Sequence, residues 1–222
     1  MIKKRAGLSA LAVLGATALA LTACSSNSSD GGGSGSANAS GIVTTNGSEP
    51  QNPLIPSNTT ETGGGKIIDS VFAGLVSYNA KGATEMDAAE SIESDDNKLW
   101  TIKLKDWEFS DGTPVTANSF VDAGNYGALS TNKQINSYFF YPIKGFDAVQ
   151  EEEPSAKTLE GLKVVDDKTF TIELNQPEAD FPARLGYSAF YPLPESAFDD
   201  LKAYGEDPIG NGPYKMDGKG AW

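Results

Sequence analysis

The chain has 222 residues, of which 39% are hydrophobic, and its 30 acidic and 17 basic side chains give a net charge of −13. This length and composition suit one or two folded domains and exclude a protein that crosses a membrane many times. An acidic surface repels phosphate backbones, so nucleic acid is excluded as a partner. The acidity itself indicates a solvated surface and does not mark a cation site.

Catalysis finds little support in the residue types. The chain has no His, which removes the usual general base and the commonest metal ligand. Its single Cys is Cys24, close to the N-terminus. No local pattern among the acidic residues marks a catalytic carboxylate pair. We therefore expect a protein that is not an enzyme, with no catalytic residue, no metal and no cofactor.

The N-terminus has the pattern of an export signal. Lys3, Lys4 and Arg5 precede a run rich in Ala and Leu, which predicts a signal peptide over residues 1–23. The alternative, a transmembrane anchor, is disfavoured because the run barely reaches spanning length. Residues 21–24, LTAC, resemble a bacterial lipobox, which implies that Cys24 carries the acyl chains, palmitate among them, of a lipoprotein. The lipid membrane is then a partner, and the protein lies on the outer face of the cell membrane, extracellular or periplasmic.

The chain after Cys24 divides into a tether and a folded part. Residues 24–40 are mostly Ser and Gly, a composition that buries no core and predicts a flexible tether. The folded part is expected to span residues 41–222, beginning with a short strand at 41–44. A loop rich in Pro and Gly follows at 50–65. Apolar residues at helical spacing then predict a helix over 66–75.

Residues 99–120 have the clearest local pattern. Trp100, Ile102 and Leu104 alternate with polar residues, which predicts a half-buried strand. Ser110, Asp111 and Gly112 predict a turn, because Asp bonds its own backbone and Gly adopts positive φ. Thr116 is then expected to cap a helix over 117–129, in which Gly124 and Gly127 are weak points.

This segment carries a resemblance to a known family. The string WTIKLKDWEFSDGTPVTANSF, residues 100–120, is similar to the signature segment of family 5 extracytoplasmic solute-binding proteins, the peptide and nickel receptors of ABC importers. The family usually has an acidic residue at the position of Ser119, so the helix cap is expected to be weaker here. The likeness covers nearly all of residues 42–222.

Two further segments match the same family, and a third between them has the pattern of a helix. Residues 161–177 predict a hairpin, with Asp166 and Asp167 in its turn rather than at a metal. Residues 194–203 are consistent with a helix. The string PIGNGPYKM, residues 208–216, matches a family element and lacks the Lys followed by Ser or Thr of a phosphate loop, so it predicts a structural turn.

The resemblance implies an α/β fold, a periplasmic-binding-protein-like (type II, family 5) lobe with a mixed sheet and flanking helices. Members of this family are more than twice as long, so the second lobe is expected beyond Trp222. The strands that would complete the first lobe are expected there too. Exposed sheet edges and a hazard of aggregation are the predicted consequence.

The resemblance also places ligand contacts in two segments. The first is the loop around residue 60, whose hydroxyls, carboxylate and backbone groups suit a peptide main chain. The second is the aromatic stretch after residue 135, where a hydroxyl-bearing ring suits a wet wall. The predicted ligand-binding residues are Asn58, Thr60, Glu61, Thr62, Gly63, Asn136 and Tyr138. The alternative is that the loop's polar groups only bond their own turn.

The function implied is capture of peptides, of the oligopeptide or dipeptide class, outside the cell and their delivery to the ABC permease subunits. A cleft that holds peptide backbone by polar groups, and leaves water-filled room for side chains, accepts many sequences. Nickel or a nickel chelate and a sugar are alternative cargoes within the family. A surface lipoprotein that only adheres or scaffolds is the alternative from another class.

Overall fold

The computed structural model describes residue 41 and residues 43–221. The predicted signal peptide (1–23), the acylated Cys24 and the tether (24–40) lie outside the described residues. The chain is divided after residue 44, and the second unit, whose described residues are 45–221, is described below. No helix of the described residues is long and apolar enough to cross a membrane.

The second unit is a mixed α/β structure. Its strands are β1 (Val76–Tyr78), β2 (Thr84–Met86), β3 (Ala89–Glu93), β4 (Leu99–Leu104), β5 (Leu162–Asp166) and β6 (Thr169–Glu173). Its α-helices are α1 (Thr62–Val71), α2 (Ala117–Ala128), α3 (Phe146–Gln150), α4 (Phe181–Arg184) and α5 (Leu201–Tyr204). Short 3₁₀ helices are η1 (Ser130–Asn132), η2 (Ile135–Phe140), η3 (Ser188–Phe190) and η4 (Glu195–Phe198).

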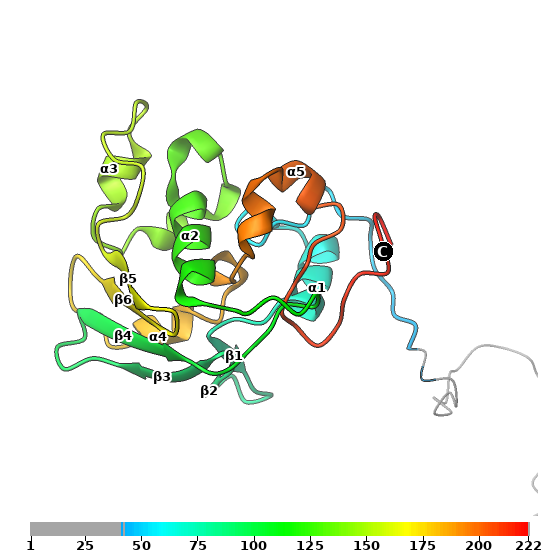
Figure 1. Cartoon of the computed structure of the whole chain (residues 1–222), viewed down its shortest axis with the longest axis horizontal. Helices are drawn as coiled ribbons and strands as arrows, with labels where there is room; N and C mark the ends of the chain where they lie inside the picture. Colours follow the sequence, from blue (N-terminus) through cyan, green and yellow to red (C-terminus); the bar gives the residue numbers. More distant parts are fainter. Residues whose placement is uncertain (1–40, 42, 222) are drawn as a thin grey trace, which may run out of the picture. The chain divides into compact units, whose positions relative to one another are not determined.

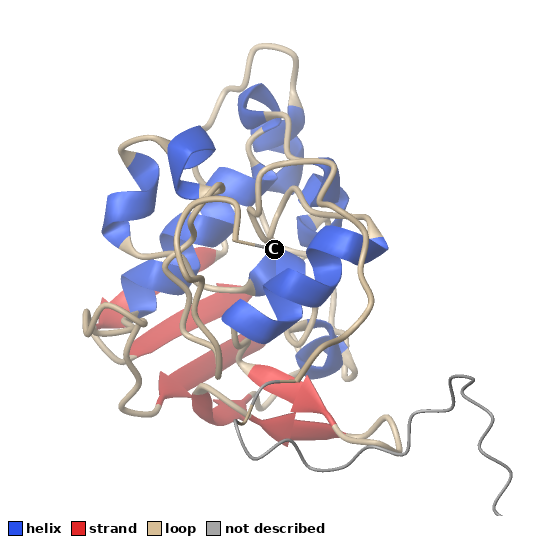
Figure 2. Cartoon of the chain, turned by 90° about the vertical axis from the view of Figure 1, so that its right-hand side faces the viewer, coloured by secondary structure: helices blue, strands red, loops and turns tan. Residues whose placement is uncertain are grey.

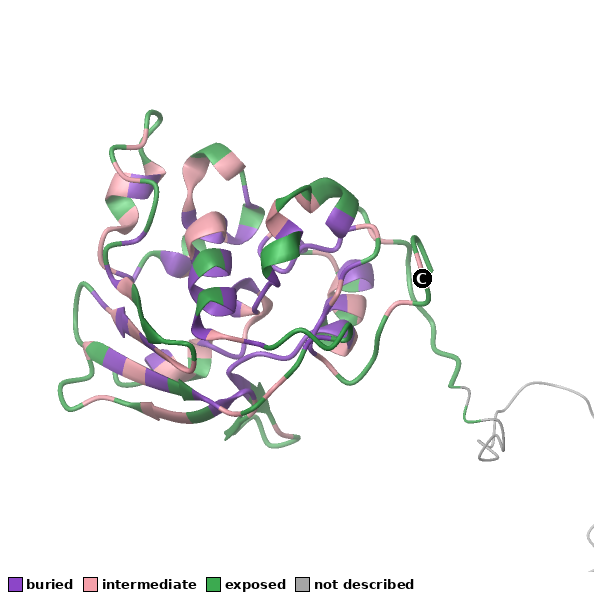
Figure 3. Cartoon of the chain, in the orientation of Figure 1, coloured by how far each residue is buried: buried purple, intermediate pink, exposed green. Residues whose placement is uncertain are grey.

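An antiparallel four-stranded sheet, in the order β3-β4-β6-β5, lies under α2 (Figure 1). Most helices lie on one side of the strands (Figure 2). The predicted strand is confirmed as β4, in which Trp100, Ile102 and Leu104 are buried. Ile102 pairs with Phe170 of β6, whose ring stacks on Phe120 of α2 at a centroid distance of 5.7 Å. The larger core cluster lies between α2 and the sheet, and a second cluster of buried residues surrounds α1 (Figure 3).

The turn and cap that connect β4 to α2 form as predicted. Gly112 has φ of +87°, and the Asp111 carboxylate accepts hydrogen bonds from the backbone N–H (2.9 Å) and hydroxyl (2.7 Å) of Thr113. These bonds lower the pKa of Asp111. Thr116 precedes α2, and its backbone N–H donates to Ser119 Oγ at 3.2 Å, the contact that a longer acidic side chain makes in a capping box.

The two glycines of α2 are sites of close packing, not merely weak points in a helix. A Cβ on Gly124 would lie 2.9 Å from the tip of Leu162, and a Cβ on Gly127 would lie 2.8 Å from the ring of Phe140. The absence of a side chain therefore lets α2 approach β5 and η2 closely. This packing stabilises α2 although its two glycines lower its helix propensity.

The predicted hairpin is confirmed as β5 and β6, but its turn is at Asp167 and Lys168, because Asp166 still pairs with Thr169 as the last residue of β5. The sheet ends in β3 on one side and β5 on the other. On β5 the side chain of Val165 is 61% exposed, so this edge presents apolar surface, as predicted for the sheet edges.

Three predicted elements differ from those in the structure. Residues 41, 43 and 44 lie in no strand, and Val43 is 87% exposed, because no described strand pairs with them. Helix α1 begins at Thr62 rather than residue 66, since Glu61 caps it and three glycines form its first turn. Strands β1 and β2 had no counterpart among the predicted elements. The helix predicted over 194–203 is broken between η4 and α5, where Asp200 caps a new helix by accepting from the Ala203 N–H at 3.0 Å.

The glycine-containing segment after residue 208 is a structural turn, as predicted. A Cβ on Gly210 would meet the carbonyl of Val71, and one on Gly212 would lie 2.6 Å from the Val71 carbonyl carbon. Between them, the Asn211 amide bonds both the N–H and the C=O of Ala73, each at 3.0 Å. This segment therefore fastens the end of α1.

The close approach of α2 to η2 gives a test of the packing. We expect Gly127→Ala to destabilise the protein by about 1–3 kcal/mol, because the added methyl overpacks against the buried Phe140 ring. Gly124→Ala is the matched control, since the flexible tip of Leu162 can turn away and the helix gains about 1 kcal/mol of propensity. Urea unfolding measures both, and equal effects would contradict this account.

Candidate functional site

The loop predicted to bind ligand is fastened to η2 from inside the protein. Asn136 of η2 is 0% exposed, and its Nδ2 donates to the carbonyls of Thr59 (3.2 Å) and Pro56 (3.4 Å). Its backbone N–H donates to the Ser57 carbonyl at 3.0 Å. Ser57 Oγ in turn donates to Gln134 Oε1 at 2.9 Å, a buried contact between the same two segments. Nothing in the local sequence pattern predicts this contact between the loop and η2.

The burial of Asn136 changes how that residue is understood. With no exposed surface it does not meet a ligand in this arrangement, and its amide holds the loop instead. A ligand contact by Asn136 stays a prediction that requires the loop to open. Asn58 is similarly engaged, because its side-chain oxygen accepts from the Ile135 N–H at 3.3 Å.

Glu61 and Gly63 also have structural partners. The Glu61 carboxylate accepts hydrogen bonds from the backbone N–H groups of Gly64 (2.5 Å) and Gln51 (3.0 Å), so it caps the N-terminus of α1. Gly63 is buried, and a Cβ there would meet the backbone of Ser48. For these two residues the alternative that the loop bonds its own turn accounts for the contacts seen.

Thr60 and Thr62 remain exposed and face a cavity, which we call the threonine pocket. It has a volume of about 270 Å³. Its lining residues come from the loop, α1, β1 and the segment before η3: Thr59, Thr60, Glu61, Thr62, Gly65, Asp69, Tyr78, Gly186, Tyr187 and Ser188. The structure thus brings three predicted residues, Thr60, Glu61 and Thr62, into one pocket.

Aromatic side chains form the far side of the threonine pocket. The ring of Tyr78 packs on Gly186, where a Cβ would lie 2.8 Å from it, and the Tyr78 hydroxyl donates to the Ala183 carbonyl at 2.6 Å. Tyr187 stacks on Phe139 at 4.0 Å between ring centroids, and Phe139 lies 4.5 Å from Tyr138. The predicted residue Tyr138, which is 57% exposed, therefore continues the aromatic surface outward from the pocket.

Asp69 contributes a carboxylate to the same pocket. Its Oδ1 accepts a hydrogen bond from the Tyr191 hydroxyl at 3.5 Å. Although Asp69 keeps exposed surface, the surrounding protein removes part of its hydration and raises its pKa, an effect that the Tyr191 bond opposes. The pKa of Tyr187 is raised by burial first, and then by the proximity of Tyr138 and Asp69.

Sequence reasoning missed Asp69, Tyr78 and Tyr187. Asp69 is one of several polar residues on the outer face of α1, and nothing in its spacing distinguishes it. Tyr78 and Tyr187 come from segments more than one hundred residues apart, which only the folded chain brings together.

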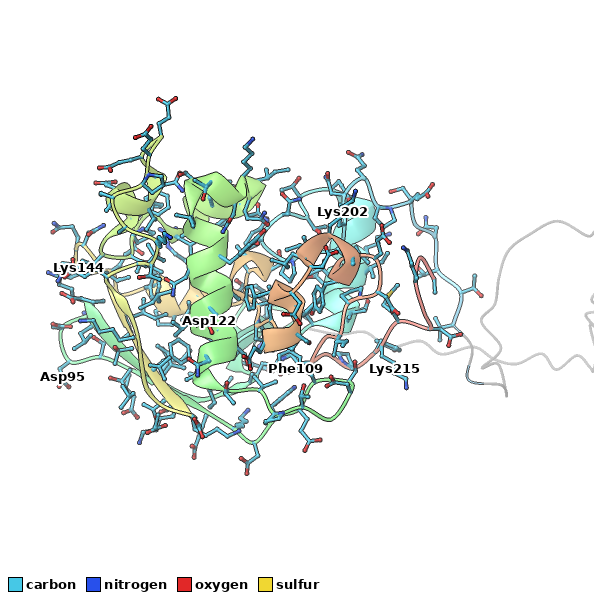
Figure 4. All side chains as sticks on the ribbon, turned by 45° about the horizontal axis from the view of Figure 1, so that its top comes forward. Asp95, Phe109, Asp122, Lys144, Lys202 and Lys215 are labelled. Carbon is cyan, nitrogen blue, oxygen red and sulfur yellow. The ribbon has the colours of Figure 1, made fainter. Side chains whose placement is uncertain are left out.

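Three larger clefts lie on the surface of the described residues. One, of about 1010 Å³, is lined by Trp107, Asn211 and several acidic residues, and it shares Asp69 with the threonine pocket. A second, of about 840 Å³, is lined by Phe109 and Asp122 among others, both labelled in Figure 4. The third, of about 680 Å³, contains Gly63 of the predicted ligand set, whereas the threonine pocket contains Thr60, Glu61 and Thr62 of that set. The choice of the threonine pocket therefore rests on its lining residues and not on its volume.

Comparison with known proteins decides the family. Residues 83–220 match the family described as bacterial extracellular solute-binding proteins, family 5 Middle. The chain belongs to this family.

Family 5 relatives include peptide-binding proteins. The chain is 31% identical over 206 residues to the oligopeptide-binding protein OppA of Bacillus subtilis, covering 89% of this chain and 38% of OppA. The structure of the Escherichia coli murein tripeptide binding protein MppA superposes with a TM-score of 0.72 at 28% identity, covering 78% of this chain and 35% of MppA. Listeria monocytogenes OppA bound to peptide gives a TM-score of 0.71 at 25% identity, covering 78% and 36%.

The family and fold class predicted from residues 100–120 are therefore confirmed. This family 5 chain spans roughly a third of the length of the relatives it matches, from 35% to 38% in the three above. The named relatives are binding proteins, in line with the expectation of a binding function. The individual ligand contacts stay predictions.

The buried amide that fastens the loop gives a second test. Asn136→Ala leaves the carbonyls of Thr59 and Pro56 without their donor, so we expect a loss of stability of about 1–3 kcal/mol. Asn118→Ala, on the exposed face of α2, is the control and should change stability by less than about 0.5 kcal/mol. Urea unfolding compares them, and an Asn136 variant as stable as the control would refute the anchoring role.

Proposed function

We propose that this family 5 chain supplies one wall of a peptide-binding cleft in an extracytoplasmic receptor, which captures oligopeptides or dipeptides and delivers them to the permease of an ABC importer. The observation that carries the proposal is the threonine pocket, where Thr60 and Thr62 from the predicted loop face Tyr78 and Tyr187. The named relatives, oligopeptide-binding and murein-tripeptide-binding proteins, support peptide as the cargo.

The chemistry of the pocket suits an extended peptide. Hydroxyl groups and the exposed backbone of the loop can exchange hydrogen bonds with peptide N–H and C=O groups, which every peptide has in common. The aromatic rings offer flat apolar surface that accepts side chains of different shape. Fastening the loop through Asn136 limits the ordering cost of binding, because the wall is already in place.

A receptor of this kind binds by closing two lobes around its ligand. In that mechanism the wall described above contacts one side of the ligand, and a facing lobe completes the desolvation of the bound peptide. The permease subunits then receive the ligand from the closed form. Nickel chelates and sugars, the alternative cargoes of the family, have no specific observation in this pocket that favours them.

We test the cargo by calorimetry with tripeptide and pentapeptide mixtures. The chain from Ser25 to Trp222 is compared with a form that carries any residues encoded after Trp222 in the same reading frame. We expect micromolar or tighter binding by the longer form, and a loss of about tenfold in the Thr60→Val, Thr62→Val double variant, whose hydroxyls are absent.

The same titration includes a nickel chelate and an oligosaccharide. If the longer form binds none of the peptides, the peptide assignment is refuted. Binding of the chelate or the sugar instead would give the cargo class.

We further propose that Cys24 is acylated and holds the receptor on the outer face of the cell membrane. The support is the sequence LTAC at residues 21–24 after a charged and apolar leader. In a bacterial host, metabolic labelling with a palmitate analogue should mark the wild-type protein and leave Cys24→Ala unlabelled and released from membranes. Equal membrane retention and labelling of the two forms would contradict the lipid anchor.

A further inference from the structure

We propose that the threonine pocket binds a positively charged group of the peptide, an ammonium or guanidinium, through the carboxylate of Asp69. This inference rests on the peptide-receptor function proposed above and adds the charge of the preferred ligand. Asp69 lies on the outer face of α1 and lines the pocket together with Tyr78 and Tyr187.

The charges around the pocket have one sign. Its lining contains the carboxylates of Glu61 and Asp69 and, among the described residues, no Lys or Arg. Glu61 is already engaged by the backbone N–H groups of Gly64 and Gln51. Asp69 accepts only a long hydrogen bond of 3.5 Å from Tyr191, and no ion pair of the described residues involves it.

Three lysines on α1 and around the adjoining cleft have other partners. Lys66, three residues before Asp69, donates to the Asn46 carbonyl at 3.1 Å. Lys105 donates to the carbonyls of Asp87 (2.6 Å) and Met86 (3.1 Å). Lys168 lies 3.4 Å from the carboxylate of Asp106. Asp69 is therefore the acidic group of this pocket with unused capacity for a cation.

The walls suit the same ligand. Tyr78 and Tyr187 bring aromatic rings to the pocket, and an aromatic face attracts a cation through its quadrupole. A carboxylate beside such rings is a common way to bind an ammonium or guanidinium group. The adjoining cleft adds three carboxylates, Asp87, Asp106 and Glu108, against one cation, Lys168, so the charged groups on this side of α1 are mostly negative beyond the pocket as well.

Two groups of a peptide carry this chemistry, its amino terminus and a basic side chain. We distinguish them with four probes: Ala-Ala-Ala, Ala-Lys-Ala and the N-acetylated form of each. Calorimetry uses the same longer form of the receptor as the cargo titration, at low and at physiological salt. A side-chain site should favour Ala-Lys-Ala over Ala-Ala-Ala by about tenfold, and an amino-terminal site should lose about tenfold on acetylation.

Asp69→Asn is the decisive variant, because it keeps the shape of the side chain and removes its charge. The variant should lose the preference for the probe that carries the additional cationic group. Its affinity for N-acetylated Ala-Ala-Ala, which has no cationic group, should stay within about twofold of the wild-type value. Asp122→Asn is the matched control, since Asp122 lies on α2 at a different cleft and its loss changes the net charge equally (Figure 4). The control should keep the full preference.

The possible outcomes separate the two proposals. Equal affinity for charged and neutral probes, or a preference that survives in Asp69→Asn, overturns the cation pocket and leaves the peptide receptor standing. An equal loss in both Asp variants reduces the effect to net charge and also overturns the pocket. Failure of all four peptides to bind removes the peptide receptor, and the cation pocket with it.

Discussion

The candidate site depends on one buried amide. Asn136 binds the carbonyls of Thr59 and Pro56 from the interior, so it joins the loop before α1 to η2, two segments separated by more than seventy residues. Buried polar groups of this kind require their partners, since an unpaired carbonyl in the interior costs free energy. The same contact sets the position of Thr60, Glu61 and Thr62, which follow directly along the chain. Hydrogen bonds from the protein interior therefore set the conformation of the loop, while its exposed hydroxyls can contact solvent and ligand.

A second constraint is steric and comes from glycines. Gly127 admits the ring of Phe140 to the surface of α2, and Gly186 admits the ring of Tyr78 to the edge of the pocket. In each case a methyl group would collide with an aromatic side chain. The first contact packs η2, which contains Asn136, against the helix that covers the sheet. The second gives the pocket its aromatic side. The close contact at Gly127 therefore positions the helix that holds Asn136, and the close contact at Gly186 shapes the pocket beside the loop that Asn136 holds.

Residues 99–120 and the β5–β6 hairpin were predictable because their information is local. Alternation sets β4, Asp111 and Gly112 set the turn, and Thr116 starts α2, each within a few residues. Helix α1 was misplaced because three glycines argue against a helix, whereas capping by Glu61 and packing against Ser48 outweigh that local preference. The site was found only in part for a related reason. The family resemblance, together with the polar loop, pointed to Thr60 and Thr62, but the pocket also needs Asp69, Tyr78 and Tyr187, which meet only in the folded chain.

A peptide bound as proposed lies against the threonine pocket and not in the larger cleft beside Trp107. Hydrogen–deuterium exchange of the peptide-loaded receptor, compared with the free receptor, distinguishes the two surfaces. Bound tripeptide should slow exchange at residues 59–62 and 186–188, whose backbone borders the pocket. Slowed exchange confined to residues 106–108 and 211–212, which line the larger cleft, would contradict this placement.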